Sequence, residues 1–362
     1  MAYAFPVFGE AKDGNVRFEN TVIQSVALIK PPRVVSSLEI EARLAPLYDR
    51  LKLSAGRLEL MTGIRERRFW DPGTRPSAVA AQAGEEAIRK ADFPREKIGC
   101  LIHGSVSRDF LEPATASLVH EMLGLGEACA LFDLSNACLG VLNGMAQVAT
   151  MIEAGQIEAG LVVTGETAEH LYHATMNKLA TDRTLNRQRL KNQFASLTIG
   201  SAAAAVLLSR AEAGKGGHRL LGGMVGTDSS ANRLCKADPK DAGPEGPIMN
   251  TDSEGLLHAG CALAARTWER TKAELGWTNE TPDHVFTHQV GRAHAKLTLE
   301  TLRIQEQKDF PTVMFMGNTG SAALPGALAL GLEQKQFNPG DKTALLGIGS
   351  GLSCLMLGTE WQ

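Results

Sequence analysis

The chain has 362 residues, of which 44% are hydrophobic and 21% are charged, and its formal net charge is −3. This composition predicts a globular protein with a sizeable core, and the charge excludes the basic surface that nucleic acids or anionic membranes select. No apolar run approaches the ~18 residues of a membrane span, and the first residues lack the apolar core of a signal peptide. We therefore expect a cytoplasmic protein with no membrane span and no nucleic-acid partner.

Short β-rich runs alternate with helical periods in the first half of the chain, which favours layered α/β structure. Buried strands are expected at residues 100–103 and 131–134, and a third strand at 160–165. Between the last two, apolar residues at helical spacing predict a helix that opens with Cys138 and stops at Gly155.

The second half repeats this order. Strands are expected at residues 284–288, 313–316 and 343–349, and an Ala/Leu-rich helix at 321–334. The step from the end of the first strand to the helix start is 35 residues in the first half and 33 in the second. The step from there to the end of the last strand is 27 and 28 residues. Near-equal spacing in the same order predicts a duplicated unit.

Other segments divide the chain. Residues 228–250 are polar and rich in Gly, Pro and Asp, which is typical of an inserted surface loop. Residues 181–193 are basic and polar and are interpreted as a mobile helix or a lid. Residues 253–275 predict a long helix that ends at Gly276. We expect an N-terminal extension at residues 1–17, one half at 18–210 and the other at 211–362.

Cys138, in the run DLSNACLG, is the first candidate catalytic residue. Cysteine is a poor helix starter, so its place after a strand and a tight turn suggests that the thiol is needed there. The free N–H groups and the dipole of a helix N-terminus favour a thiolate nucleophile. The alternative is a small buried core residue. The six cysteines have no CxxC spacing, so we expect neither a metal site nor a disulfide framework.

Three further segments carry polar groups at expected strand ends, where α/β folds place functional residues. His288, in THQVGRAH, can donate a hydrogen bond or move a proton, or it can be a core histidine. Asn318, in GNTGSAALPGAL, can donate its amide to an oxyanion, or it can be a turn residue. The glycine-rich run GIGSG at residues 347–351 can present a backbone N–H to a carbonyl oxygen. His284 and His288 lie four apart on an expected strand, so we do not expect them to form the zinc pair that a helix would allow, and His294, on the following helix, is expected to be structural.

Together with TGIRERR at residues 62–68, these motifs resemble the thiolase superfamily in its β-ketoacyl-ACP synthase III branch, from about Phe18 to the C-terminus. The resemblance implies a duplicated thiolase fold, α-β-α-β-α, with two mixed sheets around buried helices. It also implies a catalytic triad of Cys138, His288 and Asn318, an oxyanion hole of the Cys138 and Ser350 N–H groups, no cofactor and a homodimer.

The segment SVSRDFLEPATAS at residues 105–117 is similar to the OleA-type enzymes of olefin biosynthesis, which join two acyl-CoA molecules head to head. In that family a glutamate from the neighbouring subunit acts as base, and the match is Glu112, 26 residues before Cys138. Alternatively, Glu112 and the following proline only open a helix. The run IGSA at residues 199–202 departs from the Gly-Asp-Gly turn of fatty-acid synthases, which leaves substrate size and the second substrate open.

The predicted reaction is an acyl transfer from long-chain acyl-CoA to Cys138, followed by Claisen condensation with a second acyl-CoA. The product would be a 2-alkyl-3-oxoacyl compound. Two alternatives stay open from sequence. One is decarboxylative condensation with malonyl-ACP, in which an acyl carrier protein is the partner and no carboxylate base is needed. The other is an inactive thiolase-fold binding protein.

Overall fold

The computed structural model describes residues 14–212, 217–237 and 248–362 of the chain. Its main feature is one long sheet in the order β12-β13-β14-β9-β2-β8-β7-β5-β6, and β1 pairs with β9 beside this path. The strands are β1 (Asn15–Arg17), β2 (Thr21–Ile29), β5 (Ile98–Gly104), β6 (Ala130–Leu134), β7 (Ala159–Glu166), β8 (Ala202–Arg210), β9 (His218–Thr227), β12 (His284–Thr287), β13 (Lys342–Gly349) and β14 (Ser353–Glu360).

This sheet consists of the two predicted mixed sheets, which are joined at one place. β5, β6 and β7 are parallel in the first half, as β12 and β13 are in the second, and the other pairings are antiparallel. Only two residues of β2, Val22 and Ile23, pair with β9. The two halves are therefore separate sheets over most of their area, connected by a short junction.

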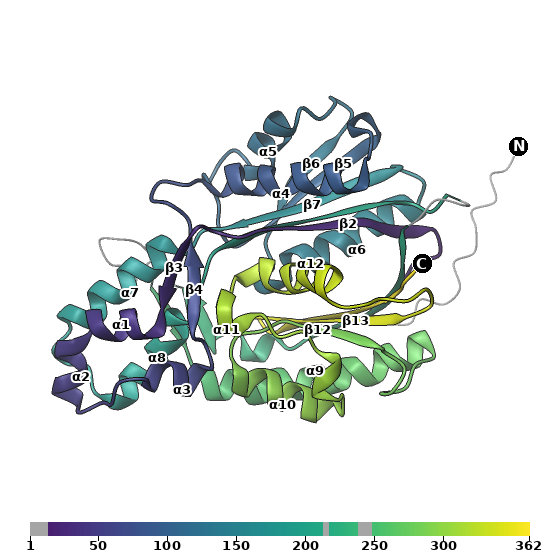
Figure 1. The fold of residues 1–362 in the computed structure, drawn as a ribbon. Coiled ribbons are helices and arrows are strands. Elements are labelled where there is room, and N and C mark those ends of the chain that lie inside the picture. Colours follow the sequence, from purple (N-terminus) through teal and green to yellow (C-terminus); the bar gives the residue numbers. More distant parts are fainter. Residues whose placement is uncertain (1–13, 213–216, 238–247) are drawn as a thin grey trace, which may run out of the picture.

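Helices form three layers around the two sheets (Figure 1). The first layer covers the outer face of the first half, and the third covers the second half. The middle layer lies between the sheets, where eight buried residues of α6 and nine of α12 contribute to the core. The layers consist of α4 (Pro76–Ala91) with α5 (Thr115–Leu123), α6 (Gly140–Glu153) with α12 (Ala323–Gln334), and α9 (Ser253–Leu275) with α10 (Arg292–Leu302). The predicted five-layer thiolase fold is thus confirmed.

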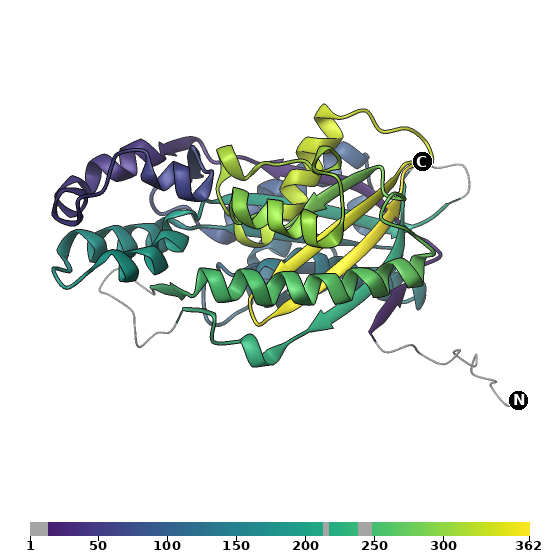
Figure 2. The same cartoon turned by 90° about the horizontal axis from the view of Figure 1, so that it is seen from below.

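A helical projection extends from one side of these layers (Figures 1 and 2). Its own apolar cluster packs the helices together. The segment 181–193, predicted as a mobile helix or lid, contributes the end of one helix and the start of the next; its lid role stays a prediction. The projection contains α1 (Ser37–Arg43), α2 (Ala45–Leu51), α3 (Arg57–Thr62), α7 (Glu169–Thr181) and α8 (Arg187–Leu197), next to the paired strands β3 (Arg33–Ser36) and β4 (Glu66–Phe69).

Most predicted elements are confirmed, including the helix 253–275, which ends at Gly276 in the left-handed conformation. The expected strand at 313–316 is wrong, because this segment is the short helix α11 (Val313–Met316). A run of four apolar residues fits either structure, and here a distant side chain decides. The Gln289 Oε1 atom accepts hydrogen bonds from the Thr312 and Val313 N–H groups (2.8 and 3.0 Å), which caps the first turn of the helix.

Two other expectations need correction. β6 is not fully buried, since it forms the sheet edge and Phe132 is 36% exposed. The polar insert 228–250 is more than a loop, since it begins with the turn η3 (Ser229–Ala231) and contains the ribbon of β10 (Cys235–Ala237) and β11 (Met249–Thr251). Residues 238–247 of the insert lie outside the described residues. Of the predicted N-terminal extension, residues 1–13 also lie outside them, and residues 15–17 pair with β9. The remaining short turns are η1 (Arg95–Lys97) and η5 (Glu306–Lys308).

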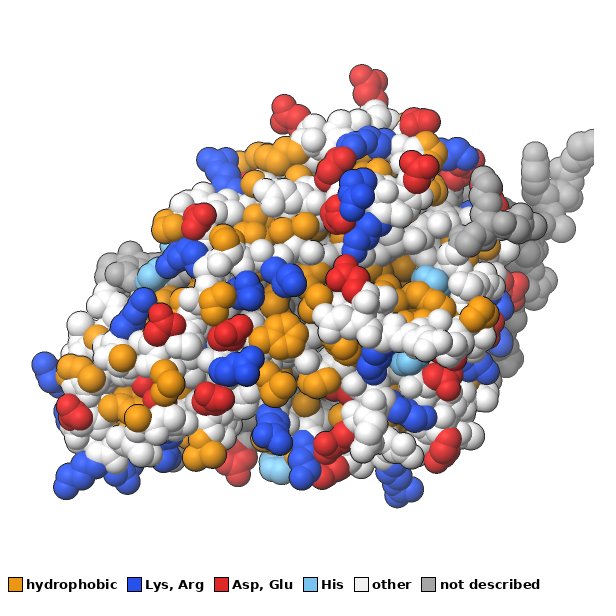
Figure 3. Space-filling model, in the orientation of Figure 1, with side chains coloured by type: hydrophobic (Ala, Val, Ile, Leu, Met, Phe, Trp, Pro, Cys, Tyr) orange, Lys and Arg blue, Asp and Glu red, His pale blue; other side chains and the backbone are white. Residues whose placement is uncertain are grey.

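Charged side chains of both signs are interspersed over the face seen in Figure 3, with hydrophobic side chains between them. Within the described ranges, no helix has the length and apolar character needed to cross a membrane. The predicted domain boundaries at 18–210 and 211–362 stay a prediction.

Candidate active site

Cys138 lies in a 3-10 turn, η2 (Ala137–Leu139), between β6 and α6. The α-helix begins only at Gly140, so the cysteine precedes the helix rather than opening it. Ala137 has a φ of 46°, a left-handed conformation that non-glycine residues rarely adopt. The Leu139 N–H donates to the Asn136 carbonyl oxygen (3.0 Å), which closes the turn. A strained turn between a strand and a helix therefore holds the thiol, and strain of this kind is typical of functional sites.

Burial of Cys138 opposes the stabilised thiolate that the sequence predicts for it. Burial, reinforced by the negative charge of Glu166, raises the pKa of Cys138 to about 12. A hydrogen bond to backbone N–H lowers this pKa only in part. Desolvation of a charged sulfur thus outweighs the helix terminus. The residue as a whole is partly exposed.

The end of β13, at the start of the glycine-rich turn, packs on the backbone of Cys138. A Cβ atom at Gly349 would lie 3.5 Å from the Cys138 nitrogen and 3.6 Å from the Asn136 carbonyl oxygen. Ser350 follows directly at the start of the turn to β14. The predicted partners of the oxyanion hole, Cys138 and Ser350, therefore belong to two backbone segments in direct contact.

His288 follows β12 directly and is bonded to the neighbouring strand, since its N–H donates to the Leu346 carbonyl oxygen (3.0 Å). The side chain is buried, and its Nδ1 atom has no hydrogen-bond partner among the described residues. Burial, and then the charge of nearby His294, lowers the pKa of His288 to about 3. The imidazole is neutral at physiological pH and can both donate and accept a hydrogen bond.

Asn318 is held by both its backbone and its side chain. Its N–H donates to the Thr198 carbonyl oxygen, and its carbonyl oxygen accepts from the Gly200 N–H, both at 2.9 Å. Its Oδ1 atom accepts from the Gly320 N–H (3.1 Å). This bond fixes the orientation of the amide, because its oxygen is already used. The Nδ2 group is then the end available to donate to a substrate oxygen.

The segments that carry these residues converge on η2. This turn packs against β13 and against η6 (Gly320–Ala322), which follows Asn318. β13 in turn pairs with β12, which leads to His288. The two halves of the fold thus bring the cysteine, the histidine and the asparagine segments to one place.

Glu112 does not belong to this buried cluster. It is exposed, in the loop between β5 and α5, next to the fully exposed side chain of Leu111. The loop is nevertheless anchored: the Ser77 N–H and Oγ donate to the Asp109 carboxylate (2.8 and 2.6 Å), and Arg108 pairs with Asp133. Glu112 is therefore presented outward by a fixed loop.

Glu166 and Gln289 are polar residues of the site that sequence reasoning missed. Glu166 ends β7 and is buried, and its charge acts on Cys138. The signal was present, since an acidic residue at the end of an otherwise uncharged, mostly apolar strand is rare away from functional sites. Gln289 is next to His288 and caps α11 through the bonds described above.

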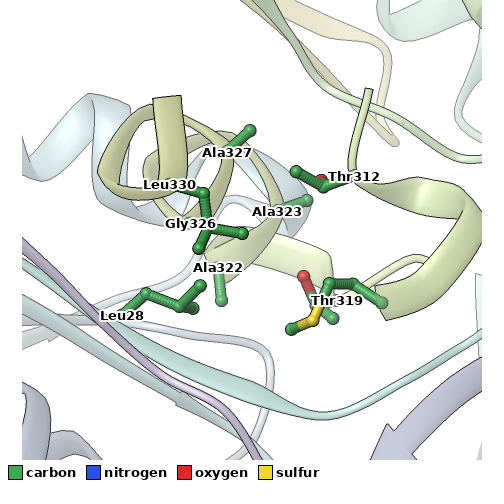
Figure 4. A pocket seen from close by; sticks show the side chains of 9 residues that line it. Leu28, Thr312, Thr319, Ala322, Ala323, Gly326, Ala327 and Leu330 are labelled. Carbon is green, nitrogen blue, oxygen red and sulfur yellow. The ribbon is translucent and has the colours of Figure 1, made fainter. Parts of the chain in front are cut away.

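A small cavity lies beside this region, along one face of α12 (Figure 4). Its size suits about one water molecule rather than an alkyl chain. It is lined by Leu28, Thr312, Met316, Thr319, Ala322, Ala323, Gly326, Ala327 and Leu330. Within the described residues no group of three or more His, Cys, Asp and Glu side chains is arranged to hold a metal ion.

The fold and this site define a condensing enzyme of the thiolase superfamily. The family model of the thiolase N-terminal domain matches residues 61–210, and that of the 3-oxoacyl-[acyl-carrier-protein (ACP)] synthase III C terminal matches residues 273–361. A relative from Shewanella oneidensis, named acyl-CoA:acyl-CoA alkyltransferase, is 38% identical over 351 residues, which cover 96% of this chain and 100% of that protein.

A relative of the same name from Xanthomonas campestris pv. campestris is 39% identical over 344 residues, covering 95% of this chain and 99% of that protein. A crystal structure of Xanthomonas campestris OleA matches with a TM-score of 0.90 and 38% identity, over 95% of this chain and 98% of that chain. The chain belongs to this acyl-CoA:acyl-CoA alkyltransferase (OleA) family.

Proposed function

We propose that this protein joins two fatty acyl-CoA molecules head to head by Claisen condensation and releases a 2-alkyl-3-oxoacyl product. The observation that carries this proposal is the strained turn of Cys138, packed against the glycine turn at Gly349 and against the segment of Asn318. The family relationship supports the same reaction, and one of the solved OleA structures contains bound lauric acid and lauroyl-CoA.

In the first stage, the sulfur of Cys138 attacks the thioester carbonyl of one acyl-CoA. The thiol proton leaves as the bond forms, and neutral His288 is the group that accepts it. The backbone N–H groups of Cys138 and Ser350 stabilise the oxyanion. Loss of one such donor typically costs ~3 kcal/mol in the transition state. The bond between the acyl carbon and the CoA sulfur breaks, His288 returns the proton to that sulfur, and CoA leaves an acyl-cysteine behind.

In the second stage, a base removes a proton from the α-carbon of the second acyl-CoA. His288 and the Nδ2 group of Asn318 donate hydrogen bonds to the enolate oxygen. The carbanion attacks the acyl-cysteine and the carbon–sulfur bond breaks. The Cys138 sulfur then takes up the proton that the base removed, which regenerates both groups.

Glu112 is the proposed base, supplied by the second subunit of a homodimer. Its exposure in the isolated chain fits a role outside its own buried site. Solved OleA structures include variants of a glutamate and of a cysteine that lie 26 residues apart, the spacing of Glu112 and Cys138.

The surface next to Glu112 supports the dimer. β6 is an edge strand with unpaired backbone groups, which proteins usually cover. Next to it the side chains of Val106, Phe110 and Leu111 are 62%, 40% and 104% exposed. Pairing of β6 with its copy would cover this edge and carry Glu112 toward the partner's site. Six free cysteines fit a reducing compartment, and a cytoplasmic location stays a prediction.

Product analysis tests the reaction. The protein is incubated with a long-chain acyl-CoA alone, and separately with the same acyl-CoA plus malonyl-ACP, and the products are identified by mass spectrometry. A condensed product of two acyl chains from acyl-CoA alone is expected. A product that forms only with malonyl-ACP would instead support the decarboxylative reaction, and absence of any CoA release would support a binding protein.

A further inference from the structure

Glu166 is a buried carboxylate with an unusually complete set of hydrogen bonds. It is 5% exposed at the end of β7. Five donors reach it: the Val106 N–H (3.1 Å), the Ser107 N–H and Oγ (3.1 and 2.9 Å), and the Ser321 N–H and Oγ (3.2 and 2.6 Å). A buried charge is costly unless such donors satisfy it, so this arrangement is specific to a carboxylate.

The five donors come from two segments with different tasks in the proposed reaction. Val106 and Ser107 begin the loop that presents Glu112. Ser321 lies three residues after Asn318, in η6. The two oxygens divide these contacts. Oε2 accepts only from Ser107, whereas Oε1 accepts both bonds from Ser321 and one from Val106. One side chain therefore connects the Glu112 loop to the Asn318 segment.

Neighbouring groups fix this carboxylate in place. The Ser321 hydroxyl donates to Glu166, so the 2.6 Å contact with Thr164 Oγ1 must have Thr164 as its donor. On the other side, Ser107 Oγ accepts from the Thr167 N–H (3.0 Å). Gly320 allows the close approach, since a Cβ atom there would lie 3.1 Å from Glu166 Oε1. The carboxylate also lies close enough to Cys138 for its charge to help raise the thiol pKa.

We propose that Glu166 is a positioning residue for two active sites at once. Through Ser321 it fixes Asn318 in its own subunit, and through Ser107 it fixes the loop from which Glu112 reaches the partner's site. This inference rests on the proposed function, because it requires Glu112 to act across a dimer.

The test uses heterodimers purified with two different tags. One chain carries Cys138→Ala, so only the other chain forms an acyl-cysteine, and its base comes from the Cys138→Ala chain. Glu166→Gln is placed on either chain. Glutamine has the same shape as glutamate, but one of its two acceptor oxygens is replaced by an NH₂ group. This group would face N–H and O–H donors that now contact an oxygen. CoA release in the first turnover reports acylation, and the condensed product reports the second stage.

We expect Glu166→Gln to slow condensation at least tenfold from either chain, while the first release of CoA is not slowed. A purely structural defect would slow both stages and act only from the chain with the active cysteine. Unchanged condensation with Glu166→Gln on the Cys138→Ala chain overturns the proposal.

Two milder variants separate the two connections. Ser107→Ala removes one tie to the Glu112 loop, so it should slow condensation only when placed on the Cys138→Ala chain. Ser321→Ala removes a tie to the Asn318 segment and should act only from the other chain. If Ser107→Ala or Ser321→Ala slows condensation equally from either chain of the heterodimer, the two-site arrangement is contradicted.

A last variant separates this inference from the proposed function. Glu112→Ala on the Cys138→Ala chain must abolish condensation if the base acts in trans. Retained condensation in that heterodimer defeats the part of the proposed function on which this inference rests, the action of Glu112 as a base in the partner's site. Loss of condensation there, together with no effect of Glu166→Gln, defeats only the role of Glu166.

Discussion

The backbone of Asn318 pairs with that of Ile199 as a single parallel bridge between the two halves of the fold. The bridge consists of the 2.9 Å bonds from Asn318 to Thr198 and from Gly200 to Asn318. It lies where two glycines permit close contact, since Cβ atoms at Gly200 and Gly317 would meet backbone or the side chain of buried Arg67. The position of the Asn318 amide is therefore set by tight packing between the halves.

Gly317→Ala should disrupt this bridge. Gly317 has a φ of 71°, and a Cβ atom there would lie 2.7 Å from the Thr198 carbonyl oxygen. We expect a loss of about 2–4 kcal/mol in the free energy of unfolding, measured in urea, from strain and overpacking. Condensation should fall at least tenfold.

Gly340→Ala is the matched control. Gly340 has a φ of 91°, but a Cβ atom there would meet nothing within 4 Å, so the variant carries the backbone strain without the clash. A loss of about 1 kcal/mol and normal condensation are expected. Equal stability losses in the two variants would show that packing at the bridge contributes nothing.

The sequence was a good guide wherever local pattern decides the structure. Apolar periodicity predicted the strands around Cys138 and the long helix that ends at Gly276, because burial and a left-handed glycine act over a few residues. The helix α11 was missed because its cap is the side chain of Gln289, 23 residues before Thr312. No periodicity in the segment itself reports such a partner.

The electrostatics of the site depended even more on tertiary structure. Motifs placed Cys138, His288 and Asn318 at the ends of elements, and the fold brings those segments together. The pKa of the Cys138 thiol could not be predicted from motifs, because desolvation and the charge of Glu166 act only after folding. The place of Glu166 at a strand end was a signal in the sequence, but its donors, from residues 106–107 and 321, could not be predicted from that place.

Cys138→Ala should abolish formation of the acyl-enzyme, because no other sulfur lies in the strained turn. Incubation with a long-chain acyl-CoA and intact-mass spectrometry should show an acyl adduct in the wild type and none in the variant. Cys261→Ala, which changes a buried cysteine of α9, is the control and should keep the adduct. An acyl adduct in the Cys138→Ala protein would rule out this nucleophile.

Glu112→Ala should separate the two stages. Acylation needs no carboxylate, so the first release of CoA should stay within twofold of the wild type. Condensation should fall by about 10²–10⁴, the usual contribution of a general base. Glu96→Ala, at another exposed glutamate of the same half, is the control. Normal condensation of acyl-CoA alone by the Glu112 variant would rule out Glu112 as the base. Normal condensation that occurs only with malonyl-ACP would favour the decarboxylative reaction, which needs no such base.

The stability of the fold should decrease as the pH falls below neutrality, because three histidines have lowered pKa values in the folded chain. Burial lowers the pKa of His288 to about 3 and those of His218 and His294 to about 4. In the unfolded chain all three bind a proton near pH 6.5, so their contribution is fully present above 6.5 and is lost toward pH 3. Asp309 acts in the opposite direction, since burial raises its pKa to about 6.

We expect a net loss of about 1–3 kcal/mol in the free energy of unfolding between pH 7 and pH 5, measured in urea at each pH. His294→Gln should show a smaller loss, because one proton-binding group is removed from the unfolded chain. Asp309→Asn should show a larger loss, because the opposing group is gone. If all three proteins lose the same stability over this range, the buried histidines do not control the acid sensitivity of the fold.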